Sequence, residues 1–415
     1  MSRCQVCGAR RVTVLLDLGV QPVCNRFLTS PTEHEYRHDL VLGQCQACGL
    51  VQLVSPFVPA AELRPRYDWV TYREPEEHLD RLAETICQLP GLGRRPTAAG
   101  ISFKDDSLLA RLASRGFRTW RVDPAGDLGI EGHGAGVETI QDRLDAQRSA
   151  ELVERHGQPD VLIARHILEH AQDLRRFTQA LRALLGPTGS LVLEVPDCTP
   201  ALDTCDYTTL WEEHTVSFTP QTFRGCCHRL NLAVSHVEAF PYAMENSLVA
   251  IGQFRGDLAG ERLAANALEQ ELARAQVFAK QLGACRTLWQ QRLTACRESR
   301  GRIAVFGAGH LSCTFLNVMG TSPWVEFVVD DHPNKQGLFM SGSHLPIRGS
   351  SALLSEGIRL CLLGMGPEGE DRLIQRQALF IERGGVFASL LLASKRTLAN
   401  IMEPDEDRHV VQAVH

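Results

Sequence analysis

Two Cys-x-x-Cys pairs, Cys4/Cys7 and Cys45/Cys48, are each followed directly by a glycine. A Cys-x-x-Cys turn directs two thiolates at one point, about 2.3 Å from a zinc ion, and the glycine lets the backbone turn tightly behind them. Two such turns complete a tetrahedral site of four protein ligands, which leaves no position for water. The sequence therefore predicts a structural zinc site within a first domain, residues 1–75. Four unrelated buried thiols are the alternative.

The composition narrows the class of protein further. Fourteen cysteines without an apolar signal segment point to the reducing cytoplasm, where paired cysteines bind metal rather than form disulfides. A length of 415 residues with 44% hydrophobic content allows two or three domains. The formal charge of -6 gives no reason to expect nucleic acid or an anionic membrane as a partner. We expect a small-molecule substrate and no membrane helix, in a monomer or a homodimer.

Residues 76–256 alternate helical and strand patterns, as an α/β sheet with crossover helices does. TAAGIS, RTWRVD, PDVLIAR and SLVLEVPD have the pattern of strands, whereas EEHLDRLAETICQL and DLRRFTQALRALL have that of helices. In such sheets ligands bind at the carboxyl ends of the strands. The segments predicted to lie at those ends are Ser102 to Ser107, Asp123, Ala164 to His166, and Glu194 to Asp197.

The remaining chain predicts two further parts. Residues 257–299 contain no proline and repeat apolar positions at helical spacing, which indicates one long helix or a helical hairpin. Residues 300–415 open with a strand followed by Gly307-Ala308-Gly309, the start of a second Rossmann-like unit. This glycine-containing turn is compatible both with a nucleotide site and with a simple tight turn. The predicted fold class is α/β, with a small zinc-binding domain, a central Rossmann-like domain and a C-terminal Rossmann-like domain.

Several segments together resemble one known family. LDLGVQPVCNRFL and CQACGLVQL are similar to its zinc domain, ARHILEH and LLGPTGSLVLEVPD to its methyltransferase core, and VVDDHPNKQGLFMSGSHLPI to its C-terminal domain. The family is that of the zinc-binding sugar C-3 methyltransferases of deoxysugar biosynthesis. The resemblance implies a class I methyltransferase domain, S-adenosylmethionine as methyl donor, and a nucleotide-linked 4-keto sugar as substrate.

The cofactor loop departs from the family pattern Ile-Gly-x-Asn-Asp-Gly. Ser102 and Asp106 stand in place of its two glycines. A β-carbon narrows the space for the cofactor, and the Asp106 carboxylate opposes the cofactor's own carboxylate, an effect that Lys104 partly offsets. The cofactor-binding residues that the resemblance implies are Ser102, Lys104, Asp105, Asp123, Arg165 and His166.

The segment LWEEHTVSFTP resembles the family's active-site segment. The resemblance makes His214 the base and places Trp211 where the family has a tyrosine. Glu213 or Glu212 is expected to orient the imidazole, and Tyr72 belongs to a tyrosine-containing segment before the core. A base near neutral pKa suits removal of the proton next to a carbonyl, after which the resulting enolate attacks the methyl group.

Two further histidines, His166 and His170, stand four residues apart, which predicts one helical face. A zinc pair would need a third ligand. We therefore expect His166 to line the cofactor pocket and His170 to have a structural role.

Two other functions remain open at this stage. With an altered cofactor loop, His214 alone would support proton transfer, isomerisation or cyclisation. A non-catalytic protein that binds a partner through its zinc domain and long helix is the third alternative, since fold does not fix function.

Overall fold

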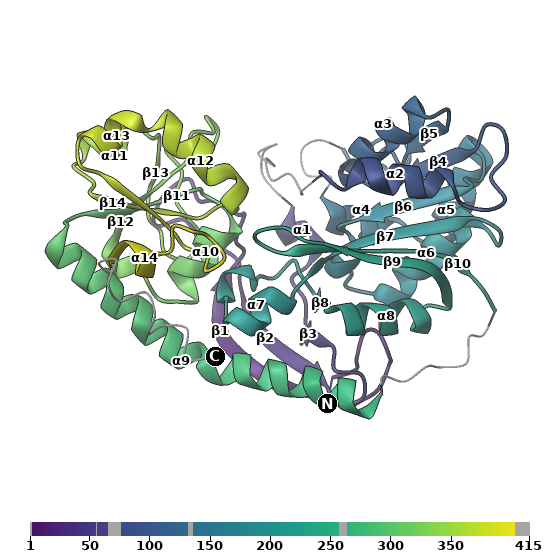
Figure 1. Cartoon of the computed structure of the whole chain (residues 1–415), viewed down its shortest axis with the longest axis horizontal. Helices are drawn as coiled ribbons and strands as arrows, with labels where there is room; N and C mark the ends of the chain where they lie inside the picture. Colours follow the sequence, from purple (N-terminus) through teal and green to yellow (C-terminus); the bar gives the residue numbers. More distant parts are fainter. Residues whose placement is uncertain (1, 55, 65–75, 132–135, 257–263, 403–415) are drawn as a thin grey trace. The chain divides into compact units, whose positions relative to one another are not determined.

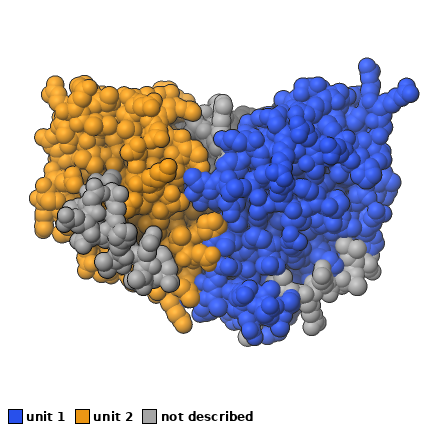
Figure 2. Space-filling model, viewed as in Figure 1, with its two compact units in different colours: residues 1–17, 41–199, 212–276 blue, residues 18–40, 200–211, 277–415 orange. Residues whose placement is uncertain are grey.

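The computed structural model describes residues 2–54, 56–64, 76–131, 136–256 and 264–402. Internal contacts divide the chain into two units that interleave along the sequence and are coloured separately in Figure 2. Unit 1 contains residues 1–17, 41–199 and 212–276, and unit 2 contains residues 18–40, 200–211 and 277–415. Within the described ranges, no helix combines the length and the apolar character needed to cross a membrane.

The main sheet of unit 1 has six strands in the order β5-β4-β6-β7-β10-β9 (Figure 1). Its strands are β4 (Thr97–Gly100), β5 (Arg118–Arg121), β6 (Val161–Arg165), β7 (Ser190–Asp197), β9 (Leu232–Phe240) and β10 (Asn246–Phe254). Strands β4, β5, β6 and β7 are parallel to one another, whereas β10 runs antiparallel to both β7 and β9. The carboxyl ends of β4, β6 and β7 therefore meet at one edge, as the sequence predicts.

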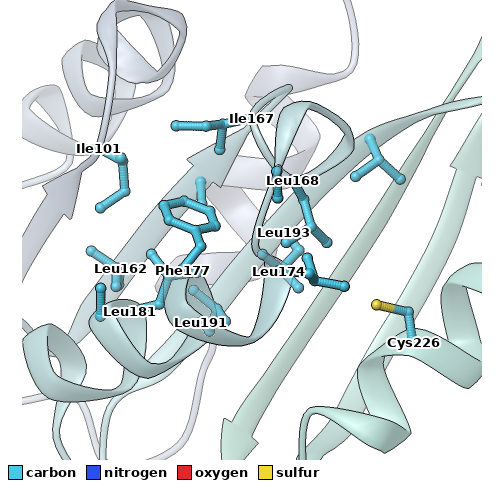
Figure 3. Packing of buried hydrophobic residues seen from close by; sticks show 14 of the residues in the cluster. Ile101, Leu162, Ile167, Leu168, Leu174, Phe177, Leu181, Leu191, Leu193 and Cys226 are labelled. Carbon is cyan, nitrogen blue, oxygen red and sulfur yellow. The ribbon is translucent and has the colours of Figure 1, made fainter. Parts of the chain in front are cut away.

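Successive strand residues point to opposite faces, and a layer of helices covers each face. One face is covered by α2 (Leu79–Cys87) and α3 (Asp106–Ser114), and the other by α4 (Val137–Arg143), α5 (Ala146–His156), α6 (Leu174–Leu185) and α8 (Pro220–Arg229). In β7, Val192 packs on the first face, and Leu191 and Leu193 on the second. Figure 3 shows Phe177 and Leu181 of α6 lying over the strands.

The zinc segment adds a smaller sheet in the order β1-β2-β3-β8. Its strands are β1 (Val12–Pro22), β2 (Arg37–Cys45), β3 (Val51–Leu53) and β8 (Val216–Ser217), and α1 (Ala60–Leu63) follows β3. Strand β3 pairs with β2 on one side and with β8 on the other. The cysteine-rich segment is thus joined by backbone hydrogen bonds to β8, which begins two residues after His214.

Unit 2 contains a five-stranded parallel sheet in the order β13-β12-β11-β14-β15. Its strands are β11 (Ile303–Phe306), β12 (Val325–Val329), β13 (Ile347–Arg348), β14 (Leu360–Leu363) and β15 (Val386–Ser389), and its helices are α10 (His310–Asn317), α11 (Ala352–Ser355), α12 (Pro367–Arg376), α13 (Ala378–Glu382) and α14 (Leu398–Met402). The order is that of a Rossmann-like sheet, so the predicted second Rossmann-like unit is confirmed.

The glycine turn after β11 has a clear steric basis. Gly307 has φ +104°, and a β-carbon there would lie 2.8 Å from the carbonyl oxygen of Gly364. The next amide, of Ala308, donates to the Asp330 carboxylate at 3.0 Å, and the Lys335 ammonium binds the same carboxylate at 3.0 Å. Both contacts involve the Asp330 carboxylate, which follows β12, and they hold the turn closed.

The long connecting segment forms a single helix, α9 (Ala265–Ser299), rather than a hairpin. The described residues also form α7 (Thr199–Thr204) and four short 3-10 helices, η1 (Phe103–Asp105), η2 (Leu168–His170), η3 (Tyr207–Thr209) and η4 (Ser322–Trp324).

Candidate functional site

The four predicted zinc ligands converge. The Sγ atoms of Cys4 and Cys48 are 3.7 Å apart, those of Cys7 and Cys45 are 3.6 Å apart, and all four lie within 4.8 Å of one another. A tetrahedral site with Zn–S bonds of about 2.3 Å requires sulfur atoms about 3.8 Å apart. The geometry fits a closed four-thiolate zinc site, and the donor set leaves no open position for chemistry.

The cofactor loop follows β4 in a conformation that needs no glycine. Ser102 has φ -136° and ψ 173°, which is extended backbone, and Asp106 has helical φ and ψ values. Ser102 also caps η1 reciprocally with Asp105. The Asp106 carboxylate lies 2.8 Å from the Arg121 guanidinium. The two glycine replacements are therefore accommodated, and the added negative charge is paired.

Asp105 holds the loop against the neighbouring strand. Its carboxylate is fully buried and accepts the amides of Ile101 at 2.7 Å, Ser102 at 2.9 Å and Arg165 at 2.9 Å. Burial raises the pKa of Asp105 to about 6, although the amides of Ser102 and Arg165 act in the opposite direction. Both oxygens accept backbone amides, so Asp105 holds the loop against β6.

A buried ion pair lies beside this loop. Arg165 at the end of β6 donates its Nε to Glu194 at 2.6 Å and its Nη1 to the carbonyl of Lys104 at 2.6 Å. Both partners are almost completely inaccessible, with exposures of 1% for Arg165 and 0% for Glu194. Although burial acts to raise it, the Arg165 charge and hydrogen bonds from two histidines hold the pKa of Glu194 well below its usual range.

Glu194 is the centre of a wider polar network. Its Oε1 lies 3.0 Å from His166 Nε2 and 3.2 Å from His78 Nε2, and it accepts the Ser247 hydroxyl at 2.7 Å. His78 Nδ1 lies in turn 2.7 Å from the Tyr242 hydroxyl. The network joins β7 and β10 to the segment before α2, and it fixes His166 in place.

Asp123 follows β5 at the same edge of the sheet. Its Oδ1 accepts the Gly126 amide at 2.5 Å, and its own amide donates to Asp127 at 2.9 Å. Asp127 is buried and is held by Arg155 at 2.6 Å and His156 at 3.0 Å. The contacts of Asp127 with Arg155 and His156 therefore hold the turn that carries Asp123 in place.

His214 belongs to a second polar cluster. Its ring meets the His170 ring edge-on, with centroids 4.8 Å apart, and Glu169 lies within 4.8 Å of both. His170 Nδ1 is 2.6 Å from Glu138, and Glu213 also lies within 4.8 Å of that pair. Although burial acts to raise it, His170 and the Lys104 ammonium hold the pKa of Glu138 below its usual range. Glu169 also lies 3.7 Å from His166 Nδ1, which joins this cluster to the Glu194 network beside the cofactor loop.

Thr215 fixes the backbone next to His214. Its amide donates to the Glu169 carbonyl at 2.8 Å, its hydroxyl donates to the Ala171 carbonyl at 2.6 Å, and its carbonyl accepts the Leu53 amide at 2.9 Å. Thr215 is 1% exposed, and β8 begins at the next residue. The zinc segment and the η2 turn therefore hold His214 jointly.

Comparison with known proteins gives a consistent result. Three family models match, described as "Putative zinc binding domain" over residues 4–63, "Methyltransferase domain" over residues 104–237, and "C-methyltransferase C-terminal domain" over residues 262–391. The C-methyltransferase NovU of Streptomyces niveus is 22% identical over 411 residues, which are 93% of this chain and 94% of NovU. The chain belongs to the zinc-binding C-methyltransferase family. It is a methyltransferase, and its predicted zinc site and family are confirmed.

Solved methyltransferases give only distant matches. An O-methyltransferase family protein from Burkholderia thailandensis has a TM-score of 0.29 at 18% identity and covers 42% of this chain and 56% of its own. The 1,6-didemethyltoxoflavin-N1-methyltransferase from the same organism has a TM-score of 0.34 at 14% identity. This match covers 50% of the present chain and 95% of that enzyme. TM-scores of this size carry no inference about the site.

The family's expected site residues are distributed between the two units. Ser102, Lys104, Asp105, Asp123, Arg165, His166, Glu213 and His214 belong to unit 1. Trp211 belongs to unit 2, where its ring stacks on His310 with centroids 4.3 Å apart. Tyr72 lies outside the described residues. The roles assigned to these residues stay predictions.

The prediction that His166 and His170 share a helical face is wrong. His166 has φ +46° at the end of β6, and only residues 168–170 form a turn of 3-10 helix. The Glu194 network holds His166 in this left-handed conformation, whereas His170 turns toward Glu138. The two histidines consequently contact different carboxylates, Glu194 and Glu138, while Glu169 lies between them, 3.7 Å from His166 Nδ1 and 3.9 Å from His170 Nε2.

Sequence reasoning missed the residues that support these clusters. Glu138 lies in a short amphipathic helix, where a glutamate ordinarily faces solvent, yet it is 7% exposed. His78 precedes α2 and is 5% exposed. No local pattern marks either residue, because their burial results from contacts with residues far away in the chain.

Proposed function

We propose that this methyltransferase transfers a methyl group from S-adenosylmethionine to a carbon next to the carbonyl of a keto substrate, of the nucleotide-linked keto sugar class. His214 is the base that removes the proton from that carbon. The proposal rests on family membership and on one structural observation. The His214 cluster is joined to the cofactor loop at the end of β6, because Glu169 of the cluster lies 3.7 Å from His166 Nδ1 and the neighbouring Arg165 donates to the Lys104 carbonyl at 2.6 Å.

The loop after β4 and the acid after β5 fit the expected cofactor position. Ser102 keeps an extended backbone, Asp106 is paired with Arg121, and Asp123 follows β5 at the carboxyl edge of the sheet. Carboxylates at that position bind ribose hydroxyls in Rossmann-like sheets. When bound there, S-adenosylmethionine supplies the electrophilic methyl group. Ser102 and Lys104 would line its amino-acid portion, and Asp123 its ribose.

His214 and its neighbours are arranged for proton abstraction. A neutral imidazole accepts the proton, and the resulting imidazolium is stabilised by the carboxylates of Glu169 and Glu213 nearby. Glu138 accepts the Nδ1–H of His170, which fixes the ring that packs against His214. A positioned base of this kind contributes about 10²–10⁴-fold to the rate. Thr215 limits the movement of His214 relative to the loop.

Calorimetric titration of the zinc-loaded protein with S-adenosylmethionine and S-adenosylhomocysteine tests the cofactor. We expect binding that is weakened in Asp123→Asn, a change that preserves an acceptor for the Gly126 amide. Asp80→Asn, which changes an exposed carboxylate on α2, is the matched control. No binding to the wild-type protein would contradict methyl transfer.

The base is tested separately by exchange of substrate α-protons with deuterated solvent in the absence of a methyl donor. We expect exchange with a nucleotide-linked keto sugar that is lost in His214→Asn. Exchange without any cofactor binding would instead favour the alternative of proton transfer alone, with isomerisation or cyclisation as the reaction.

A further inference from the structure

A cavity of about 780 Å³ lies in unit 1 between the first zinc turn, helix α6 and the end of α8. Residues 3–8 form one wall, residues 172–182 contribute a second, and residues 229–231 a third. None of these residues belongs to the cofactor loop or to the His214 cluster. The volume is within the range of about 300–1,000 Å³ that small-molecule sites occupy.

Positive charge dominates the cavity wall. Arg3, Arg175, Arg182 and Arg229 line it, and Asp173 is the one acidic residue among the lining residues. The Asp173 carboxylate already accepts the Arg176 amide at the start of α6. Four guanidinium groups thus make the wall of this cavity positively charged, although the chain as a whole has a formal charge of -6.

Three of these arginines have no partner for their side chains within the described part of the chain. Arg3, Arg175 and Arg229 make no ion pair or side-chain hydrogen bond there. Other arginines of unit 1 are paired, such as Arg81 with Glu238 at 2.6 Å and Arg148 with Glu151 at 2.7 Å. The cavity therefore gathers three guanidinium groups that no carboxylate among the described residues neutralises.

Uncharged polar groups complete the wall. Both polar atoms of the Gln5 side chain are buried without a hydrogen-bond partner among the described residues. The first-turn amides of α6, at Leu174 and Arg175, add donors at the positive end of a helix of 12 residues. A buried amide without a partner costs free energy unless a ligand satisfies it.

We propose that this cavity binds a small anion carrying a diphosphate group, at a site separate from methyl transfer. Guanidinium forks match phosphate oxygens with paired hydrogen bonds, and the Gln5 amide adds a further donor. The competing explanation is that the arginines only balance the double negative charge of the zinc tetrathiolate, whose ligands Cys4 and Cys7 line the same cavity.

Calorimetric titration of zinc-loaded, full-length protein with inorganic diphosphate at low ionic strength tests the proposal. We expect binding that weakens by roughly a hundredfold in Arg175→Gln/Arg229→Gln, since each lost charged contact is worth about tenfold. Added salt should weaken it as well. The matched control is Arg176→Gln on the same helix, because the Arg176 guanidinium donates to the Asp142 carbonyl at 2.9 Å and does not line the cavity.

A second titration with uridine diphosphate identifies the source of the diphosphate group. If uridine diphosphate binds with the same affinity as inorganic diphosphate, the site recognises the diphosphate group alone. If uridine diphosphate binds more tightly, the site also recognises the nucleoside. Absence of binding to the wild-type protein, or equal binding to the double variant, overturns the proposal. So does a double variant that loses zinc to a chelator faster while its diphosphate binding is unchanged. S-adenosylhomocysteine binding, measured in the same samples, is expected to be unaffected.

Discussion

Replacing Glu194 by glutamine is the most informative perturbation of the methyltransferase unit. The change preserves shape but removes the charge that Arg165 Nε contacts at 2.6 Å in a site where both residues are almost completely buried. Removal of one partner from a buried ion pair costs about 3–5 kcal/mol, because the other charge stays buried without compensation. The hydrogen bonds from His166 and Ser247 weaken in addition.

Hydrogen exchange of peptides covering β6 and β7 measures this effect in unit 1 alone. We expect the free energy of opening to fall by about 3–5 kcal/mol in Glu194→Gln. Glu238→Gln is the matched control, because Glu238 pairs with an exposed Arg81 at 2.6 Å and exposed pairs contribute about 0–1 kcal/mol. The double variant Glu194→Leu/Arg165→Met should recover part of the loss, since apolar residues of similar volume can replace a buried pair.

The pH dependence provides an independent check on the same residue. The pKa of Glu194 is held well below its usual range in the folded protein. Its contribution to stability is therefore present above the unfolded pKa and is lost as the pH falls through the folded pKa. A loss below about 1 kcal/mol in Glu194→Gln, or a double variant no more stable than the single one, would refute the assignment of Glu194 as the network's charged centre.

Four further results are expected. Zinc removal by a chelator should speed hydrogen exchange at residues 212–217, since β3 of the zinc segment pairs with β8; unchanged exchange would contradict this coupling. Thr215→Val should destabilise the unit by about 1–3 kcal/mol by urea unfolding, whereas Thr215→Ser keeps the hydroxyl. The pKa of Asp105 is raised to about 6 from 3.8 in the folded protein. Its contribution to the free energy of unfolding should therefore fall by about 3 kcal/mol as the pH rises between these two values. Asp105→Asn should remove that slope in pH-dependent unfolding. His214→Asn should lower the methyl-transfer rate about 10²–10⁴-fold, while Glu138→Gln should have a smaller effect on the rate.

The sequence determined the elements that depend on local geometry. A Cys-x-x-Cys turn places two thiolates together whatever surrounds it, so the four zinc ligands follow from the spacing alone. The succession of helical and strand patterns over residues 76–256 likewise predicted the strands before Ser102 and Asp123. The replacement of the two family glycines by Ser102 and Asp106 was visible in the sequence as well. Its effect on the structure of the loop was not.

Only the tertiary structure decided how those departures are accommodated. The backbone at Ser102 is extended and needs no glycine, and Arg121 pairs with the Asp106 carboxylate; neither feature is encoded in the loop itself. Glu138 and His78 support the two polar clusters from distant parts of the chain. A buried charge is stable only where partners from several elements meet it, and that condition depends on the packing of the whole unit rather than on any local pattern.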